Sequence, residues 1–561
     1  MIASCDMTDL DLLDNPNEAT PEYANIDDLY NQIQIDFEEN IETMWFNTAG
    51  MSRMISHTGA FDYTSATTPN DFNFLWTNTY AGLYPDITAL ENIAAERGLD
   101  FHSGISKILK AYSLVSMIDL FGAVPNTQAG DGTNTIAPSA DSGTEVYAAA
   151  DTLLVAAIAQ LTEVTAIAPI NDLIYGGAAD KWVKLAKTLQ LRNAVTTRLI
   201  NPNSAAIINA LVTEGDIITD SGDDFVIQYG STRTNPASRH PLYENMYESD
   251  YGHYMSNYYM WLLRADKTDA AGNPFVDPRI RYYFYRKVSN SVDQDPNVYS
   301  CHFSGFPSQE SKPLHFDNVD PRLPYCVAWE DGYFGRDHLN AEGIPPDGNI
   351  RTAYGLYPAG GKFDDDTFTD TQQEGTTGGL GQGIQPVMLA SFVDFLRAEA
   401  ALTLGTNDNA RALLESGMRK SIAKVQSFSS LVSADFARQI TSLVDGSVNT
   451  VEAIYVPTAE EVDVYVAFVL DAYDAADADG KLDITMKEYY IALWGNGLEA
   501  YNMWRRTGKP NNMMPSLESN PGIFIRTFFL PADHVNFNAN ASQKTLTTPV
   551  FWDTNPDGFS Y

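Results

Sequence analysis

Apolar side chains recur at helical spacing in many parts of this 561-residue chain. Ile105, Ile108, Leu109, Tyr112 and Val115 share one helix face, because residues three, four and seven positions apart point the same way. This pattern predicts a helix around 105–115. Similar patterns predict helices near 27–46, 73–96, 145–165, 180–189, 204–214, 389–404, 408–425, 433–444, 458–475 and 486–493.

The pattern changes between 216 and 385, where Gly, Pro, Asp and Asn become dense and helical periodicity mostly ends after 257–266. We expect a long, loop-rich insertion with a few short strands. The helical stretches before and after it look alike, so we predict one helical scaffold and not two separate domains. Several helix pairs are compatible with degenerate helical repeats. The predicted fold class is therefore all-α.

Charge and composition narrow the classes of function. The net charge is −38, from 73 acidic and 35 basic residues. Nucleic-acid binding and docking on a bare anionic lipid surface both need a basic footprint, so both are disfavoured. Aromatic residues reach 12%, which favours aromatic positions in clefts as well as in the core.

Cysteines are few: Cys5, Cys301 and Cys326. No CxxC occurs, so a zinc ribbon or a thioredoxin-type motif is not expected. Cys301 and Cys326 could form a disulfide in an oxidising compartment, and two buried free thiols are an equal alternative. The chain shows no full signal peptide and no apolar run of spanning length.

Three stretches resemble ligand loops without matching them. In 474–488, an EF-hand alignment puts Ala475 and Met486 at the positions that need carboxylates, which favours a helix–helix turn. In 355–363, a phosphate loop would need Lys one residue earlier and a following Ser or Thr. The four carboxylates in 363–370 could hold a hard cation, but a solvated acidic loop is favoured. We expect no catalytic residue, no metal and no cofactor.

Six segments of the chain carry its most distinctive sequence. They are "KILKAYSLVSMIDLFGAVPNTQA" (107–129), "DLIYGGAADKWVKLAKTLQLRNAVTTRLI" (172–200), "DPRIRYYFY" (277–285), "MLASFVDFLRAEAALTLG" (388–405), "MKEYYIALWGNGLEAYNMWRRTGKP" (486–510) and "PGIFIRTFFLPADHVNFN" (521–538). From the residues themselves, we expect Arg192 and Arg198 to pair with acids or cap carbonyls, and Glu399 to be partly buried and paired. Together these segments resemble the SusD/RagB family of outer-membrane nutrient-binding lipoproteins. They keep the family's order along the chain, although Ala179–Asp180 and Ala186–Lys187 depart from its pattern.

The resemblance implies a single SusD-like domain of tetratricopeptide-type helix pairs over 21–561, with the ligand-binding insertion at about 216–385. Family members are not enzymes. They capture an oligosaccharide, or in some cases a peptide, at the cell surface and pass it to a SusC-like TonB-dependent transporter. We expect a glycan ligand. Peptide capture is the alternative, and a glycoside hydrolase of unrecognised type is third.

The resemblance also gives a role to the N-terminus. Family members are cut before a cysteine and lipidated on it, and "IASC" is compatible with the end of a lipobox. Cys5 is therefore the expected lipid attachment site, and residues 1–20 the lipoprotein N-terminus with an acidic tether. Acyl chains would hold the protein on the outer membrane, facing the cell exterior.

Aromatic residues in the loops are the candidate sugar-binding positions, because sugars stack their apolar faces on rings. Packing of the loops is an equal alternative for each ring, and Trp76, on a predicted helix, is expected in the core. The candidates are Trp329, Tyr333, Phe334, Tyr299, Tyr63 and Trp76.

Overall fold

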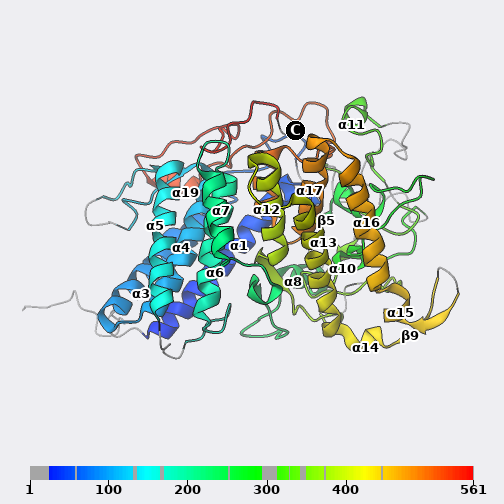
Figure 1. The fold of residues 1–561 in the computed structure, drawn as a ribbon, viewed down its shortest axis with the longest axis horizontal. Coiled ribbons are helices and arrows are strands. Elements are labelled where there is room, and N and C mark those ends of the chain that lie inside the picture. The colour runs from blue at the N-terminus through cyan, green and yellow to red at the C-terminus, as the bar shows by residue number, and fades with distance from the viewer. Residues whose placement is uncertain are drawn as a thin grey trace, which may run out of the picture.

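The structure, a computed structural model, shows long helices that stand side by side, with the C-terminal segment crossing one end of them (Figure 1). It describes residues 25–56, 60–130, 135–164, 170–249, 253–292, 312–327, 329–340, 349–369, 371, 375–443 and 446–559.

The N-terminal half of the scaffold is a set of long helices. α4 (Asp100–Phe121) carries the apolar face predicted at 105–115, and that face is buried. It packs extensively against α5 (Gly143–Glu163), whose first turn is closed by a capping box between Ser142 and Glu145. The other helices of this half are α1 (Ile26–Met51), α2 (Asn73–Thr77), α3 (Tyr84–Arg97), α6 (Ala179–Thr196) and α7 (Ser204–Glu214).

Within the described residues, α5 is the one helix that is long and apolar enough to cross a membrane, judged by length and composition alone. Its buried residues Val146, Ala150, Leu154 and Leu161 lie at helical spacing, and both α4 and α6 pack against it. Its apolar face thus serves the packing of the helices.

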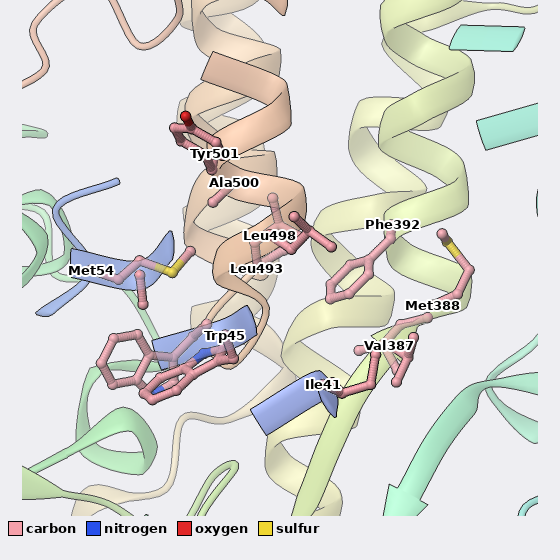
Figure 2. Packing of buried hydrophobic residues seen from close by; sticks show 14 of the residues in the cluster. Ile41, Trp45, Met54, Val387, Met388, Phe392, Leu493, Leu498, Ala500 and Tyr501 are labelled. Atoms are coloured by element: carbon pink, nitrogen blue, oxygen red, sulfur yellow. The ribbon is translucent and has the colours of Figure 1, made fainter. Parts of the chain in front are cut away.

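The C-terminal half repeats this arrangement. α12 (Ala390–Leu404) packs on α13 (Ala410–Gln426), and both contact α17 (Ala478–Ala492). α16 (Ala459–Ala475) covers α13, and α18 (Gly497–Thr507) packs against α1. Figure 2 shows the core where the two halves meet, with side chains from α1, α12, α18 and the strand before α12 pointing toward one another. The helices before and after the insertion therefore share one core.

The strands form short antiparallel pairs, some within the insertion or at its base and some outside it. β4 (Phe225–Gln228) pairs with β8 (Ile384–Met388), so the first and last parts of the insertion lie together at its base. The remaining pairs are β1 (Ile55–Ser56) with β5 (Tyr254–Met255), β2 (Ala123–Val124) with β3 (Asp141–Ser142), β6 (Phe284–Tyr285) with β7 (Ala353–Tyr354), and β9 (Gln439–Thr441) with β10 (Val448–Thr450). The predicted all-α fold with a few short strands is confirmed.

Short helices lie between the strands of the insertion, between α13 and α16, and after α18. They are α8 (Pro241–Tyr247), α9 (Asn257–Arg264), α10 (Ile280–Tyr283), α11 (Leu314–Asp317), α14 (Ser433–Phe436), α15 (Val451–Tyr455) and α19 (Ala532–Phe537).

Of two predicted elements after α13, one is wrong and one is confirmed. The helix expected at 433–444 is wrong, because α14 ends at Phe436 and the chain enters the β9–β10 hairpin. Ile440 and Thr441 are β-branched, and such residues favour a strand. The helix–helix turn expected at 474–488 is confirmed: Asp477 caps α17 by accepting a hydrogen bond from the Gly480 amide at 2.8 Å.

Buried ion pairs tie the family-like segments together. Arg192 donates to Asp119 at 2.9 Å and to Glu499 at 2.7 Å, and all three residues are fully buried. Arg198 donates to Glu399 at 3.0 Å. The expected pairing of these two arginines with acids is confirmed, and Glu399 is more deeply buried than expected.

Candidate functional site

The structure buries the candidate rings that it describes, three of them inside the insertion and two, Tyr63 and Trp76, in the N-terminal half. Trp329 is 8% exposed, Tyr333 5% and Phe334 3%. Tyr63 is 1% exposed and Trp76 7%. Tyr299 lies outside the described residues, as do Cys5 and Cys301. None of the five described rings presents an open face for stacking in this structure, and their role in sugar binding stays a prediction.

Trp329 lies beneath a cation. The Arg264 guanidinium is 5.4 Å from the centre of the Trp329 ring and also forms an ion pair with Asp331. The backbone of the same turn is fixed to an earlier segment, since the Ser291 amide donates to the Trp329 carbonyl at 3.0 Å. Gly332 is required here: it has φ +87°, and a Cβ would lie 1.9 Å from the Val288 carbonyl oxygen.

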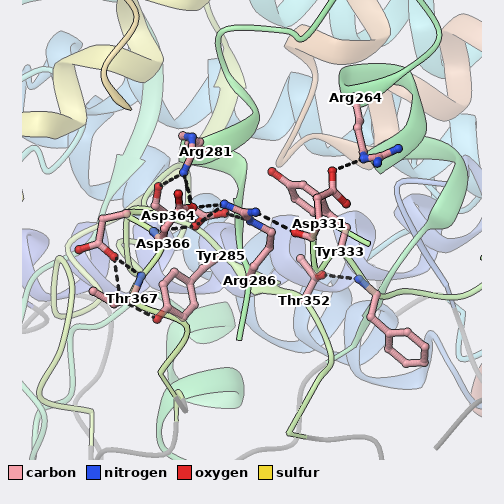
Figure 3. Close-up of polar contacts among 12 residues, drawn as sticks. Arg264, Arg281, Tyr285, Arg286, Asp331, Tyr333, Thr352, Asp364, Asp366 and Thr367 are labelled. Atoms are coloured by element: carbon pink, nitrogen blue, oxygen red, sulfur yellow. Dashed lines mark hydrogen bonds and ion pairs between the residues drawn. The ribbon is translucent and has the colours of Figure 1, made fainter. Parts of the chain in front are cut away.

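Tyr333 lies beside a network of two arginines and two aspartates (Figure 3). Arg286 donates two hydrogen bonds to the Asp364 carboxylate, from Nε at 2.6 Å and from Nη2 at 3.1 Å. It also contacts Asp366. Arg281 reaches Asp366 at 2.9 Å. Burial raises the pKa of Tyr333 above its ordinary range, so the phenol stays neutral.

The described part of the acidic stretch, 363–369, is therefore not a solvated loop, although its sequence suggested one. Asp364 is fully buried, and its charge is matched by arginines. Burial alone would raise the pKa of Asp366, but Arg281 and Arg286 hold it below its usual value. The described residues contain no group of His, Cys, Asp or Glu suited to a metal ion. These carboxylates fix the insertion in place.

Phe334 belongs to a second, smaller cluster with Tyr254 and Ile350. Two guanidiniums cover the Tyr254 ring: Arg336 at 4.0 Å and Arg351 at 5.2 Å from its centre. Such cation–π contacts strengthen when water is excluded, and all of these side chains are buried. Arginines stacked on aromatic rings thus add to the ion pairs and strand pairs that hold the insertion together.

The structure brings Tyr63 next to His338, in the same segment (329–340) as Trp329, Tyr333 and Phe334. The Tyr63 hydroxyl accepts a hydrogen bond from Arg53 at 2.7 Å and lies 3.3 Å from His338 Nε2. Trp76 is not part of this group: its ring packs on His534 at a centroid distance of 4.3 Å and on Tyr80 at 4.8 Å.

Asp337 is a buried acid next to this contact. Its carboxylate accepts hydrogen bonds from Asn257 Nδ2 at 2.7 Å and from the Cys326 amide at 2.8 Å. Burial raises the pKa of Asp337 to about 6, although both hydrogen bonds act in the opposite direction. Cys326 itself is disulfide-bonded, and its partner lies outside the described residues.

The sequence analysis missed the arginines that hold these rings, and it missed the rings that are exposed. Four arginines share the stretch 264–286 with Asp266, Asp269 and Asp277, and this concentration of opposite charges was a usable signal. Phe61 is 43% exposed, Phe74 53% and Phe537 82%. They lie on two segments joined by backbone hydrogen bonds, Tyr63 to Pro521 and Ala532 to Pro69, each at 2.8 Å. Nothing in the local sequence distinguishes these phenylalanines from core residues.

Family models match both halves of the chain. Residues 16–323 match the SusD-like model described as "Starch-binding associating with outer membrane". Residues 382–545 match the model described as "Susd and RagB outer membrane lipoprotein". The protein thus has the helical, SusD-like architecture, and it belongs to the SusD/RagB family. A comparison with curated proteins gave no match.

Solved structures share this fold at low sequence identity. A chitin-binding protein superposes with a TM-score of 0.64 at 17% identity, covering 95% of this chain and 100% of that chain. A chitin-binding SusD homologue from Flavobacterium johnsoniae gives 0.62 at 20% identity, covering 94% and 98%. A SusD-like protein from Bacteroides thetaiotaomicron gives 0.61 at 19% identity, covering 92% and 93%. At these identities the likeness shows the fold.

Proposed function

We propose that this protein is a glycan-binding lipoprotein of the outer cell surface, which captures an oligosaccharide or polysaccharide and delivers it to a SusC-like TonB-dependent transporter. Membership of the SusD/RagB family carries the proposal, since both matching models describe outer-membrane proteins and one describes starch binding. The protein acts by binding, without catalysis.

Charge favours neutral glycans as ligands. The protein carries a net charge of −38, and a polyanionic polysaccharide would be repelled at long range. Two proteins of the same fold are described as chitin-binding, which makes oligomers of N-acetylated sugars a first choice for testing. Sugar affinities are modest, because water competes for every hydroxyl group.

Anchoring through Cys5 completes the proposal. An acyl chain contributes about 0.8 kcal/mol per buried methylene group, and more than one chain is needed for firm attachment. Fatty-acid labelling of cells that express the protein with its native leader tests this step. Labelling should disappear in Cys5→Ala, and undiminished labelling of that variant would remove Cys5 as the anchor.

Calorimetric titration of the purified protein tests ligand capture. The panel is chitin oligosaccharides, neutral β-glucans, α-glucans, mannans and alginate. Binding of at least one neutral glycan, without new reducing ends during prolonged incubation, supports the proposal. Product formation would contradict a pure binding role. If none of the glycans binds, peptide capture would be favoured instead.

A further inference from the structure

A groove of about 520 Å³ lies apart from the candidate rings, between the segment 274–281 and the chain that enters α16. Phe275, Val276 and Ile280 line one side, and Ile454, Val456 and Val464 line the other. In Figure 1, α10, α15 and α16 are neighbours at the end of the molecule opposite α3 and α5. This volume is typical of a site that binds a small molecule or a few side chains.

The walls of the groove are fixed by contacts behind them. Phe275 stacks on Phe468 with a centroid distance of 4.5 Å and an interplanar angle of 8°. Asp277, Arg279 and Glu488 form a fully buried ion-pair network next to the same wall, with distances of 2.6 and 3.0 Å. The groove is therefore preformed, so binding would need little rearrangement.

The mouth of the groove exposes apolar surface to water. Val276 is 50% exposed and Val464 is 52% exposed, one on each side. Apolar side chains that line a cavity and still face water are typical of a contact surface. Covering them would release water and contribute binding free energy in proportion to the buried area.

The charge around the mouth is negative. Glu460 and Glu461 lie in the first turn of α16 and line the groove. Glu461 caps the helix by accepting a hydrogen bond from the Thr458 amide at 2.7 Å, whereas the Glu460 side chain is exposed beside it. Arg281, at the inner end, is matched by Asp364 and Asp366. An anionic ligand would thus meet repulsion, and a cationic one attraction.

We propose that this groove binds a peptide segment that combines large apolar side chains with Lys or Arg. The apolar side chains would fill the space between Phe275 and Val464, and the basic residue would face Glu460. A sugar fits less well, because eight of the fifteen lining residues are aliphatic or proline, and Asp277, Arg281 and Tyr465 already bind neighbouring groups. This site is separate from the proposed glycan site and goes beyond that function.

Fluorescence anisotropy with two labelled probes tests the proposal. One probe is a short peptide in which Leu and Pro alternate with Lys, and the other has Glu in place of each Lys. The Lys peptide should bind at least about tenfold more tightly than the Glu peptide. Its affinity should fall as salt is added, because salt screens exposed charges. Equal binding of both probes, or no binding of either, would overturn the proposal.

Two variants with matched controls locate the binding. Val464→Arg puts a bulky cation into the mouth and should weaken the Lys peptide at least about tenfold. Val155→Arg is the control, since Val155 is 54% exposed on α5, far from the groove in sequence and on another helix. Glu460→Gln should weaken binding severalfold and reduce its salt dependence, whereas Glu96→Gln on α3 should change neither.

The glycan panel separates this site from the proposed function. Val464→Arg should leave glycan titrations unchanged, and glycan binding can fail without affecting the peptide result. If Val464→Arg abolishes glycan binding and leaves the peptide affinity unchanged, the groove belongs to the glycan and the peptide proposal is wrong.

Discussion

Arg506 and Glu399 form a two-point ion pair at the centre of the scaffold. Arg506 Nε lies 2.7 Å from Glu399 Oε1, and Nη2 lies 2.8 Å from Oε2, with both side chains fully buried. Arg198 adds a third hydrogen bond to the same carboxylate. Burial alone would raise the pKa of Glu399, but Arg506 and Arg198 hold it below its usual value. One carboxylate on α12 thus links the turn after α6 to α18.

Replacing this carboxylate should destabilise the protein strongly. Glu399→Gln leaves two buried guanidiniums without their negative partner, and breaking a buried pair on one side costs about 3–5 kcal/mol. Chemical denaturation would show the loss in the free energy of unfolding. Asp474→Asn is the control, since its pair with Arg411 is about half exposed, and it should cause no measurable change. A fully stable Glu399→Gln protein would contradict the assigned role of the pair.

The helical scaffold could be predicted because its signal is local. The buried face of α4 was readable from Ile105, Leu109 and Tyr112, since each helix buries one side against its neighbours. The helix expected at 433–444 failed because only its first turn is helical. Ile440 and Thr441, which follow that turn, pair with β10, a partner further along the chain.

The interior of the insertion could not be predicted in the same way. Its density of Gly, Pro and Asp indicated exposed loops, yet Arg264 covers Trp329 and Arg286 covers Tyr333. These partners come from distant parts of the sequence, and no periodicity links an arginine to the ring that it will cover. The pairing of β4 with β8 is equally non-local. The sequence could therefore predict which residue types belong to the candidate site, but it could not predict that they are buried.

Asp337 should make stability depend on pH. Its folded pKa of about 6 lies above the ordinary value of 3.8, so the folded protein keeps a proton that the unfolded chain has lost. The contribution of Asp337 to the free energy of unfolding is fully present below pH 3.8 and is lost as the pH rises through 6. The loss amounts to about 2–3 kcal/mol, since one pKa unit corresponds to about 1.4 kcal/mol.

Unfolding titrations between these two pH values would isolate this effect. The free energy of unfolding of Asp337→Asn should decline less steeply with rising pH than that of the wild type, whatever its absolute value. Glu96→Gln, in an exposed position on α3, should follow the wild-type slope. Identical slopes for the wild type and Asp337→Asn would show that Asp337 does not titrate in this window.

Cys326 is disulfide-bonded, and we predict Cys301 as its partner. The two cysteines lie in the same loop-rich insertion, and a loop of this length predicts a stabilisation of about 3 kcal/mol. Mass spectrometry of unreduced peptides should recover a linked 301–326 pair. Cys301→Ala should release a free thiol at Cys326 and lower the melting temperature, while Cys5→Ala should do neither. A linked pair between Cys5 and Cys326 would contradict this assignment.

Trp329 provides the sharpest test of the candidate site. Because the ring is buried beneath Arg264, Trp329→Ala should lower the free energy of unfolding by about 3 kcal/mol or more. If this part of the insertion shapes the sugar site, affinity for the cognate glycan should also fall severalfold. Trp182→Ala is the matched control, since Trp182 is a fully buried tryptophan on α6 and packs against Tyr175. Calorimetric titration at a temperature where both variants remain folded separates the two effects. A glycan affinity reduced only by Trp329→Ala assigns the ring to the site, whereas equal affinities for both variants would make Trp329 a core residue of the insertion.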